Sequence, residues 1–249
     1  MPERSAADDS QPGAKAAAGR FRGLITDWGG VLTNPIRDTV NAWLRAEGIL
    51  QDSYFAVMRL WMRQAYAIGQ AAGPIHLLER GECSDEDFER LLAASLVRIN
   101  GQPVSAAGLL TRMFAATVLD PTMPDLIRAV RRAGLRTALL SNSWGSVGFG
   151  YPRQMLSELF DAVVISAEVG MRKPEQRIFT LTVELLGLRP DECVFIDDVQ
   201  ANVEAAESVG LVGVHHEAAS STAARLAELL NIPLPGFAPN QEASQVSHD

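Results

Sequence analysis

The sequence predicts an α/β fold in which a parallel sheet is interrupted, after its first strand, by a helical insert. Two observations support this prediction. Five short apolar runs end at polar residues or glycine, a pattern typical of buried strands. These runs are 21–27, 135–140, 162–165, 193–196 and 211–214. Helical patterns separate the later runs, and strands that alternate with helices of this length form βαβ units in a parallel sheet.

Three helices are predicted between the later strands, over 125–133, 174–186 and 199–209. Their apolar residues recur at the three- and four-residue spacing of one helix face. These residues are Leu126, Ile127 and Val130 in the first helix, and Ile178, Leu181 and Leu185 in the second. Pro174 opens the second helix and Gly210 closes the third, as proline and glycine commonly do.

The segment 35–120 lacks this alternation and is predicted to be wholly helical. Three groups of apolar residues follow helical spacing. The groups are Val40, Trp43 and Leu44; Phe55, Met58 and Met62; and Phe88, Leu91, Leu92, Leu96 and Ile99. Ser84 and the acidic residues after it resemble a capping box at the start of the third helix.

We therefore divide the chain into a core of residues 20–34 and 121–235 and a helical cap of residues 35–120. The segments 1–19 and 236–249 are polar and contain proline, so we expect them to be disordered tails. The first of them has no apolar stretch of the kind found in a signal peptide.

The composition excludes several classes of protein. With 249 residues and 47% hydrophobic residues, the chain can bury a core, so wholesale disorder is excluded. A net charge of −8 argues against nucleic acid, which requires a basic face, and against anionic membrane surfaces. No run approaches the ~18 apolar residues of a membrane helix. The two cysteines, Cys83 and Cys193, form no disulfide framework, so we expect a cytoplasmic protein that is a monomer or a homodimer.

Polar side chains stand where three of the predicted strands end. They are Asp27, Ser141, Asn142, Asp197 and Asp198. Lys173 lies at the start of a predicted helix, and Asn202 lies one turn into the helix that follows the acidic pair. Because the carboxyl ends of parallel strands meet at one edge of the sheet, we expect these residues to form one site.

The chemistry of this set is specific. Three clustered carboxylates without histidine or thiolate repel one another unless a cation lies among them, and oxygen ligands favour Mg²⁺. A carboxylate, a lysine and a serine hydroxyl around that ion would bind a phosphoryl group and spread the charge of its transition state. A carboxylate held in line can also attack phosphorus, giving an aspartyl phosphate that water hydrolyses.

This ordered set resembles the haloacid dehalogenase superfamily over nearly the whole expected ordered chain. Asp27 matches the nucleophile of that family, Ser141 its second-motif hydroxyl, Lys173 its third-motif lysine, and Asp197 and Asp198 its closing acidic pair. The stretches GMRKPE at 170–175, FIDDVQAN at 195–202 and LERGECSD at 78–85 are similar to the branch that contains epoxide-hydrolase N-terminal domains and sugar-phosphate phosphatases.

The resemblance implies a Rossmann-like core, a mobile helical cap and Mg²⁺ held by Asp27, the Gly29 carbonyl and Asp198. Asp197 would act on the metal through water, and Asn202 would support the site without touching the metal. The catalytic residues would be Asp27, Ser141 and Lys173, and the phosphorylated small-molecule substrate would bind to Ser141, Asn142 and Lys173. The implied activity is that of a Mg²⁺-dependent phosphatase of sugar-phosphate type.

Gly29 departs from the pattern of this superfamily. Its phosphatases usually carry a second aspartate at this position, which protonates the leaving group and then activates water. General acid–base catalysis of this kind accelerates a reaction by roughly 10²–10⁴-fold. One possibility is a substrate with a good leaving group, which needs less protonation. The other is that the cap supplies the missing carboxylate, with Glu79, Glu82 and Asp85 as candidates.

Two alternatives to the phosphatase follow from this departure. A haloacid dehalogenase also uses an aspartate nucleophile and lacks the second aspartate, but it needs no metal, so the pair Asp197 and Asp198 argues for the phosphatase. The other alternative is a catalytically weak regulator that binds a phosphorylated ligand. Trp28 and Trp144 flank the site, and we expect them to complete the edge of a core rather than to bind substrate.

Overall fold

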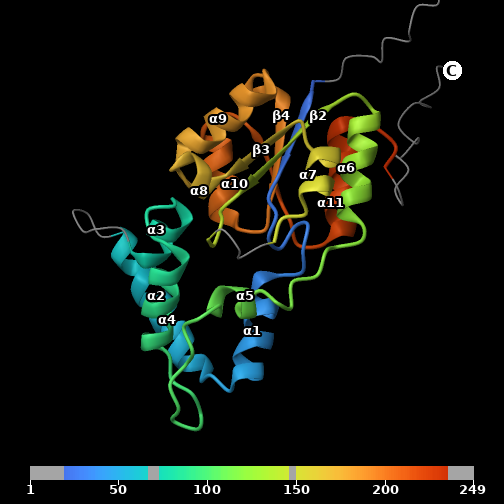
Figure 1. Ribbon diagram of the computed structural model, residues 1–249. Helices are drawn as coiled ribbons and strands as arrows, with labels where there is room; N and C mark the ends of the chain where they lie inside the picture. Colours follow the sequence, from blue (N-terminus) through green and yellow to red (C-terminus); the bar gives the residue numbers. More distant parts are fainter. Residues whose placement is uncertain (1–19, 67–72, 146–149, 235–249) are drawn as a thin grey trace, which may run out of the picture.

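The computed structural model describes residues 20–66, 73–145 and 150–234, with no side-chain description for 63–66. The predicted tails, 1–19 and 236–249, lie outside the described residues. Figure 1 shows two parts, a sheet flanked by helices and a separate group of helices joined to it by two chain segments. Among the helices described, none has the length and apolar character needed to cross a membrane.

The five predicted strands are confirmed and form one sheet in the order β3-β2-β1-β4-β5, with every neighbouring pair parallel. They are β1 (Gly23–Thr26), β2 (Arg136–Ser141), β3 (Ala162–Ile165), β4 (Cys193–Asp197) and β5 (Val212–His215). β1 lies in the middle of the sheet, between β2 and β4. The strands that carry the predicted site residues are therefore adjacent.

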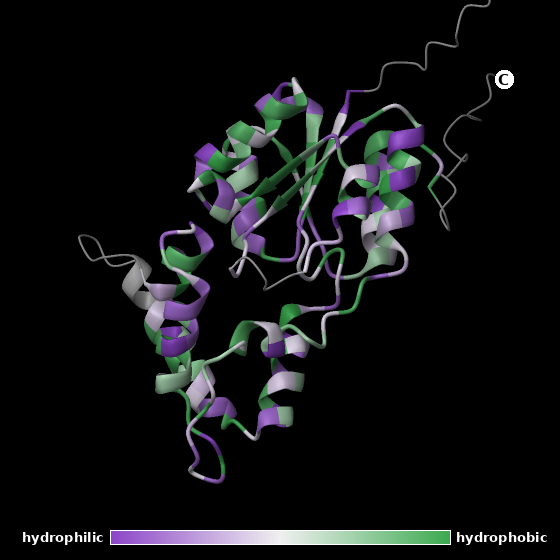
Figure 2. Ribbon diagram, viewed as in Figure 1, coloured by the Kyte–Doolittle hydropathy of each residue, from purple (hydrophilic) through white to green (hydrophobic). Residues whose placement is uncertain are grey.

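Helices cover both faces of this sheet. On one face lie α8 (Ser166–Val169), α9 (Gln176–Leu186) and α10 (Gln200–Ser208), and on the other lie α6 (Met123–Arg132), α7 (Arg153–Leu159) and α11 (Ala219–Leu230) (Figure 1). Successive strand residues point to opposite faces, so Leu24 packs into one buried cluster and Ile25 into the other. Figure 2 shows the strands largely hydrophobic between helices that carry both polar and apolar residues.

The predicted helical insert between the first two strands is confirmed. It contains α1 (Ile36–Glu47), α2 (Gln51–Tyr66), α3 (Pro74–Glu79), α4 (Asp85–Ser95) and α5 (Leu109–Met113). Ser84 caps α4 as predicted, because its hydroxyl accepts a hydrogen bond from the Asp87 amide at 3.1 Å. We call this group of helices the cap.

The predicted apolar faces extend too far at three residues of the cap and one of the core. Met62 is 49% exposed, Leu91 50% and Ile99 75%, so none of them belongs to the core. α4 ends at Ser95, and Ile99 lies beyond it, where its amide donates to the Gly48 carbonyl at 2.8 Å. The backbone pairing of this loop with the end of α1 replaces the helical turn that the spacing predicts. Leu185, on α9, is likewise exposed.

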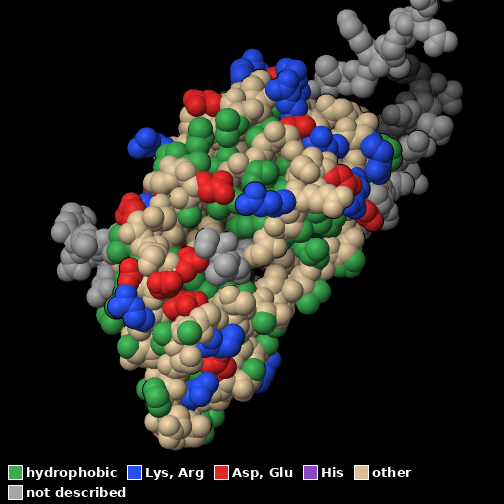
Figure 3. All heavy atoms as spheres, in the orientation of Figure 1, with side chains coloured by type: hydrophobic (Ala, Val, Ile, Leu, Met, Phe, Trp, Pro, Cys, Tyr) green, Lys and Arg blue, Asp and Glu red, His purple; other side chains and the backbone are tan. Residues whose placement is uncertain are grey.

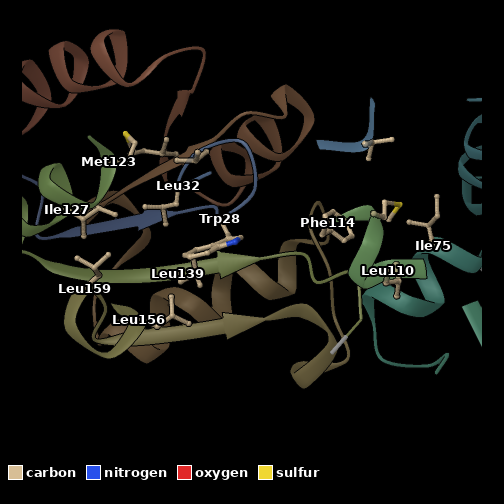
Figure 4. Close-up of a cluster of buried hydrophobic side chains, with 14 of the residues drawn as sticks. Trp28, Leu32, Ile75, Leu110, Phe114, Met123, Ile127, Leu139, Leu156 and Leu159 are labelled. Atoms are coloured by element: carbon tan, nitrogen blue, oxygen red, sulfur yellow. The ribbon is translucent and has the colours of Figure 1, made fainter. Parts of the chain in front are cut away.

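One hydrophobic cluster continues from the core into the cap. Figure 4 shows Ile127, Leu139 and Leu159 at one end of it and Phe114 and Leu110 at the other, with Trp28 between them. The cap is therefore packed against the core by buried apolar side chains that belong to both.

Candidate active site

The predicted site residues come together at the carboxyl edge of the sheet, on the side that faces the cap (Figure 1). Asp27 follows β1, Ser141 ends β2, and Asp197 ends β4. Lys173 reaches this edge from the loop between α8 and α9. Contacts within this group join Lys173 to Asp27 and Asp197, Asn142 to the backbone of Lys173, and Asn202 to Asp197.

Lys173 lies between two carboxylates. Its Nζ atom is 2.8 Å from Oδ1 of Asp27 and 2.6 Å from Oδ2 of Asp197. The Lys173 side chain is 1% exposed and that of Asp197 is 0% exposed, so water screens these charges little. The sequence contains only one other lysine, Lys15, although it is rich in arginine. A compact ammonium group suits this narrow position better than a planar guanidinium does.

Asp197 is saturated by partners within the protein. Its Oδ1 accepts from the Val199 amide at 2.8 Å, and Nδ2 of Asn202 lies 3.0 Å and 3.1 Å from its two oxygens. Together with Lys173 these groups hold the carboxylate in one orientation. The side chain of Asn202 therefore contacts Asp197.

Asn142 holds the backbone of Lys173. Its Nδ2 donates to the Lys173 carbonyl at 3.0 Å, and its Oδ1 accepts from the Lys173 amide at 2.8 Å. Both ends of the Asn142 amide are therefore bonded to the residue that carries the ammonium group. This pair of bonds fixes where the Lys173 side chain begins.

Three carboxylates form the acidic cluster that the sequence predicts. Asp27, Asp197 and Asp198 each offer an oxygen, and these oxygens lie within 4.8 Å of one another. Burial raises the pKa of Asp27 from 3.8 to about 7, against the lowering effect of Lys173. Burial also raises the pKa of Asp198, to about 6, with Asp197 as the second cause. A cation among these oxygens would stabilise the ionised forms of Asp27 and Asp198, which burial disfavours. The donor set therefore fits Mg²⁺.

Gly30 leaves room for one of these carboxylates. Its φ angle is 78°, and a Cβ atom there would lie 2.2 Å from Oδ2 of Asp198. A side chain at this position would both strain the backbone and displace the carboxylate.

Tyr151 is a residue of this site that no sequence pattern predicts. Its hydroxyl lies 2.9 Å from Oγ of Ser141, and its ring centroid is 5.3 Å from that of Trp28. Tyr151 follows a glycine-rich stretch and precedes α7, a helix that the apolar pattern of the sequence does not predict. No spacing relates it to the strand ends, so the sequence offered no signal for it.

The two tryptophans beside the site pack as expected. Trp28 is 1% exposed and belongs to the cluster shared by core and cap. Figure 4 shows its indole nitrogen pointing away from Ile127 and Leu159. Among the described residues this buried nitrogen has no hydrogen-bond partner. Trp144 lies edge-on to Phe88 and Phe114, with ring centroids 6.1 Å and 6.0 Å away.

Two reciprocal ion pairs join α3 of the cap to the loop that carries Lys173. Nε of Arg172 donates to the buried carboxylate of Glu79, and Arg80 lies 2.5 Å from Glu175. Each part of the protein thus supplies one arginine and one glutamate.

The three acidic cap residues expected near Gly29 have different surroundings. Glu79 is buried, and Lys173 is one of the charges that lower its pKa against the larger effect of burial. Glu82 is exposed. Asp85 is half-buried, and its carboxylate lies beside Gly145 in the loop after β2. Figure 3 shows acidic side chains gathered where the cap meets the core.

A cavity of about 800 Å³ opens between the cap and the edge of the sheet. Its walls include Leu78 and Asp85 from the cap and Ser143, Tyr151, Leu156 and Ile165 from the core. Tyr151 thus lines this cavity and also bonds Ser141 through its hydroxyl.

This fold and this site define a class of enzyme. Residues 21–210 match the family model of the haloacid dehalogenase-like hydrolases, and the chain belongs to that family. The sequence-based resemblance is thereby confirmed, and the chain is a hydrolase of this type.

Two of the relatives are much longer than this chain. The chain is 30% identical over 224 residues to acyl-CoA dehydrogenase family member 10 of Mus musculus, covering 88% of this chain and 20% of that protein. It is 26% identical over 207 residues to bifunctional epoxide hydrolase 2 of Sus scrofa, covering 78% of this chain and 36% of that one. The chain thus spans about a fifth and about a third of these two proteins.

A relative of similar length is the sesquiterpene phosphatase astK of Aspergillus oryzae, 28% identical over 215 residues, covering 84% of this chain and 97% of that one. Among solved structures, a haloacid dehalogenase family enzyme of Bacteroides thetaiotaomicron superposes with a TM-score of 0.61 at 23% identity. That likeness covers 81% of this chain and 95% of the other, and it supports the fold alone. The same enzyme has been crystallised with magnesium and inorganic phosphate.

Proposed function

We propose that this protein is a Mg²⁺-dependent phosphatase that acts on a small phosphorylated metabolite through an aspartyl phosphate on Asp27. The observation that carries this proposal is the position of Lys173, whose ammonium group lies between Asp27 and Asp197. A dianionic phosphoryl group placed against Asp27 would meet this positive charge in a site with little water. A phosphatase among the relatives of similar length supports the same activity.

In this proposal Asp27, Asp198 and the Gly29 carbonyl hold Mg²⁺, which supplies positive charge to the phosphoryl oxygens when bound. Asp197 acts on the metal only through water, because its own oxygens are bonded to Lys173, Asn202 and the Val199 amide. Its role is to hold Lys173 in place. Asn142 contributes to substrate binding in the same indirect way, because both ends of its amide bond the backbone of Lys173.

The covalent step uses the ionised Asp27. A carboxylate oxygen forms a bond to phosphorus while the bond from phosphorus to the ester oxygen of the substrate breaks, and the leaving oxygen takes a proton from its surroundings. Water then attacks phosphorus, inorganic phosphate leaves and the carboxylate is restored. Ser141 and Lys173 bind the phosphoryl oxygens and offset their charge during both steps.

The absence of a carboxylate at Gly29 restricts which leaving groups the substrate can carry. With no side chain there to donate a proton, substrates whose leaving group is already acidic are favoured, such as an anomeric sugar phosphate. Among the three cap carboxylates, Glu79 is bonded to Arg172 and Glu82 is exposed. Asp85 is the remaining candidate for proton transfer, and it lines the cavity beside Tyr151.

The proposal is tested by measuring phosphate release from a panel of sugar phosphates and from p-nitrophenyl phosphate, with Mg²⁺ and with EDTA. We expect activity that needs Mg²⁺ and is lost in Asp27→Asn. Activity that survives EDTA or the loss of Asp27 would contradict the mechanism. Halide release from a 2-haloacid without metal would show a dehalogenase instead. Folded protein that binds Mg²⁺ but releases neither product would indicate a regulator.

A further inference from the structure

Tyr151 is placed at the phosphoryl end of the site by two contacts. Its hydroxyl lies 2.9 Å from Oγ of Ser141, and its ring packs against Trp28 at an interplanar angle of 59°. Trp28 directly follows Asp27 in the chain. The phenol is therefore held next to the hydroxyl that, under the proposed function, binds the phosphoryl group.

The hydrogen-bonding capacity of Ser141 makes this contact informative. A serine hydroxyl has one hydrogen and two lone pairs. To bind a phosphoryl oxygen, which only accepts, Ser141 must direct its single hydrogen toward the substrate. In the pair with Tyr151 the serine oxygen must then accept, and the phenol must donate.

Ser143 is a second hydroxyl that bonds the phenol of Tyr151. The Ser143 hydroxyl also bonds the phenol, and Oγ of Ser143 donates its own hydrogen to the Gly145 carbonyl at 2.6 Å. Toward Tyr151 it can therefore only accept. Within the described part of the chain, the Ser141 and Ser143 hydroxyls are both acceptors for the phenol hydrogen, and rotation about the phenol C–O bond exchanges them. Burial raises the pKa of Tyr151, and the charge of Asp27 adds to this effect, so the phenol keeps its hydrogen.

We propose that Tyr151 is a positioning residue that orients the Ser141 hydroxyl toward a bound phosphoryl group by donating its own hydrogen to the serine oxygen. This inference rests on the proposed function, because it takes Ser141 to be a phosphoryl ligand. Without the phenol, Ser141 loses the partner that fixes its rotation, and its hydrogen is distributed over several directions.

Tyr151→Phe isolates this role. The ring remains against Trp28 and keeps its place in the wall of the cavity of about 800 Å³, so only the hydroxyl is lost. Tyr54→Phe is a matched control, since Tyr54 is buried in the cap, with its ring edge-on to Trp43 at 6.0 Å. Tyr151→Leu is a second variant without the hydroxyl, used if Tyr151→Phe does not fold.

The test measures the binding of inorganic phosphate by calorimetry in saturating Mg²⁺, for wild type, Tyr151→Phe, Ser141→Ala and the double variant. We expect Tyr151→Phe to weaken phosphate binding about fivefold and Ser141→Ala to weaken it about tenfold or more. Because Tyr151 acts through Ser141, the double variant should bind phosphate as Ser141→Ala does. Tyr54→Phe should bind as the wild type does.

Three results would overturn the inference. These are unchanged binding in Tyr151→Phe, a further fivefold loss when Tyr151→Phe is added to Ser141→Ala, and a wild type that does not bind phosphate. The second result would show that Tyr151 acts independently of the serine. Turnover is measured separately. A wild type that binds phosphate but hydrolyses no ester would contradict the proposed function, and the binding cycle would still decide the role of Tyr151.

Discussion

The ammonium group of Lys173 lies 2.8 Å from the carboxylate of Asp27, at a position where the lysine side chain is 1% exposed. A buried charge of this kind is stable only while its partners are present. The pair, together with Asp197, therefore links the stability of the protein to the charge state of its site.

Replacing this lysine should affect both stability and activity. Lys173→Met leaves Asp27 and Asp197 without their cation, so we expect the free energy of unfolding at pH 8 to fall by about 3 kcal/mol. Phosphate release should fall more than about 100-fold. The destabilisation should shrink toward pH 5, because burial raises the pKa of Asp27 to about 7 and this carboxylate can then bind a proton. Urea unfolding at the two pH values measures this.

Arg128→Met is the control for Lys173→Met. Arg128 pairs with Asp125 and Glu158 at the surface, where such pairs contribute less than about 1 kcal/mol. If Lys173→Met unfolded at the same urea concentration as Arg128→Met at pH 8, the structural importance of the buried pair would be disproved.

Magnesium binding should depend on pH in a defined direction. In the metal-free protein the pKa of Asp27 is raised to about 7 by burial, and that of Asp198 to about 6. A protonated carboxylate must lose its proton before it binds a cation, so Mg²⁺ affinity should rise with pH. Between pH 6 and pH 8 we expect the affinity to increase on the order of tenfold.

Calorimetry at the two pH values measures this dependence. In Asp27→Asn the larger part of it should be absent, since the amide does not titrate. An affinity that is equal at pH 6 and pH 8 in the wild type would show that Asp27 is already ionised in the metal-free protein.

Gly30 and Gly48 offer a matched comparison. Both have positive φ angles, 78° and 62°, but a Cβ at Gly30 would meet Asp198 and one at Gly48 would meet nothing within 4 Å. Both alanine substitutions should lower the free energy of unfolding by about 1 kcal/mol through backbone strain. Only Gly30→Ala should weaken Mg²⁺ binding, about tenfold or more, because it displaces the Asp198 carboxylate. Equal Mg²⁺ affinities in the two variants would contradict this account.

The fold could be predicted from the sequence where patterns are local. The apolar runs located all five strands, and the lack of alternation located the insert. α7, α8 and α11 were missed, and α8 is only four residues long. The end of α4 was misplaced because the backbone pairing that replaces its last turn joins residues that are far apart in the sequence.

The site could be predicted only in part, for the same reason. Asp27, Ser141 and Asp197 stand at strand ends, where parallel topology brings residues together. Tyr151 reaches Ser141 through tertiary packing against Trp28, and no sequence spacing encodes that contact. The partnership of Arg172 with Glu79, 93 residues away, was likewise absent from any sequence pattern.

Of the two ion pairs between cap and core, the more buried pair should contribute more to the stability of the protein. The side chains of Arg172 and Glu79 are 12% and 7% exposed, whereas those of Arg80 and Glu175 are 25% and 34% exposed. Arg172→Met leaves a buried carboxylate unpaired and should lower the free energy of unfolding by about 3 kcal/mol. Arg80→Met should lower it by about 1 kcal/mol.

Arg225→Met, which breaks the exposed pair with Glu228, is the control for this series and should change stability by less than about 0.5 kcal/mol. Urea unfolding of the three variants measures the order. A larger loss in Arg80→Met than in Arg172→Met would contradict the importance of burial.

The central claim is that Asp27 forms a covalent bond to phosphorus, and trapping this intermediate tests it most directly. Acid-quenched turnover of ³²P-labelled acetyl phosphate, in the presence of Mg²⁺, should leave label on the peptide that contains Asp27. The label should disappear on a chase with unlabelled substrate and be absent in Asp27→Asn. Label on another residue, or phosphate release by Asp27→Asn at the wild-type rate, would contradict the claim.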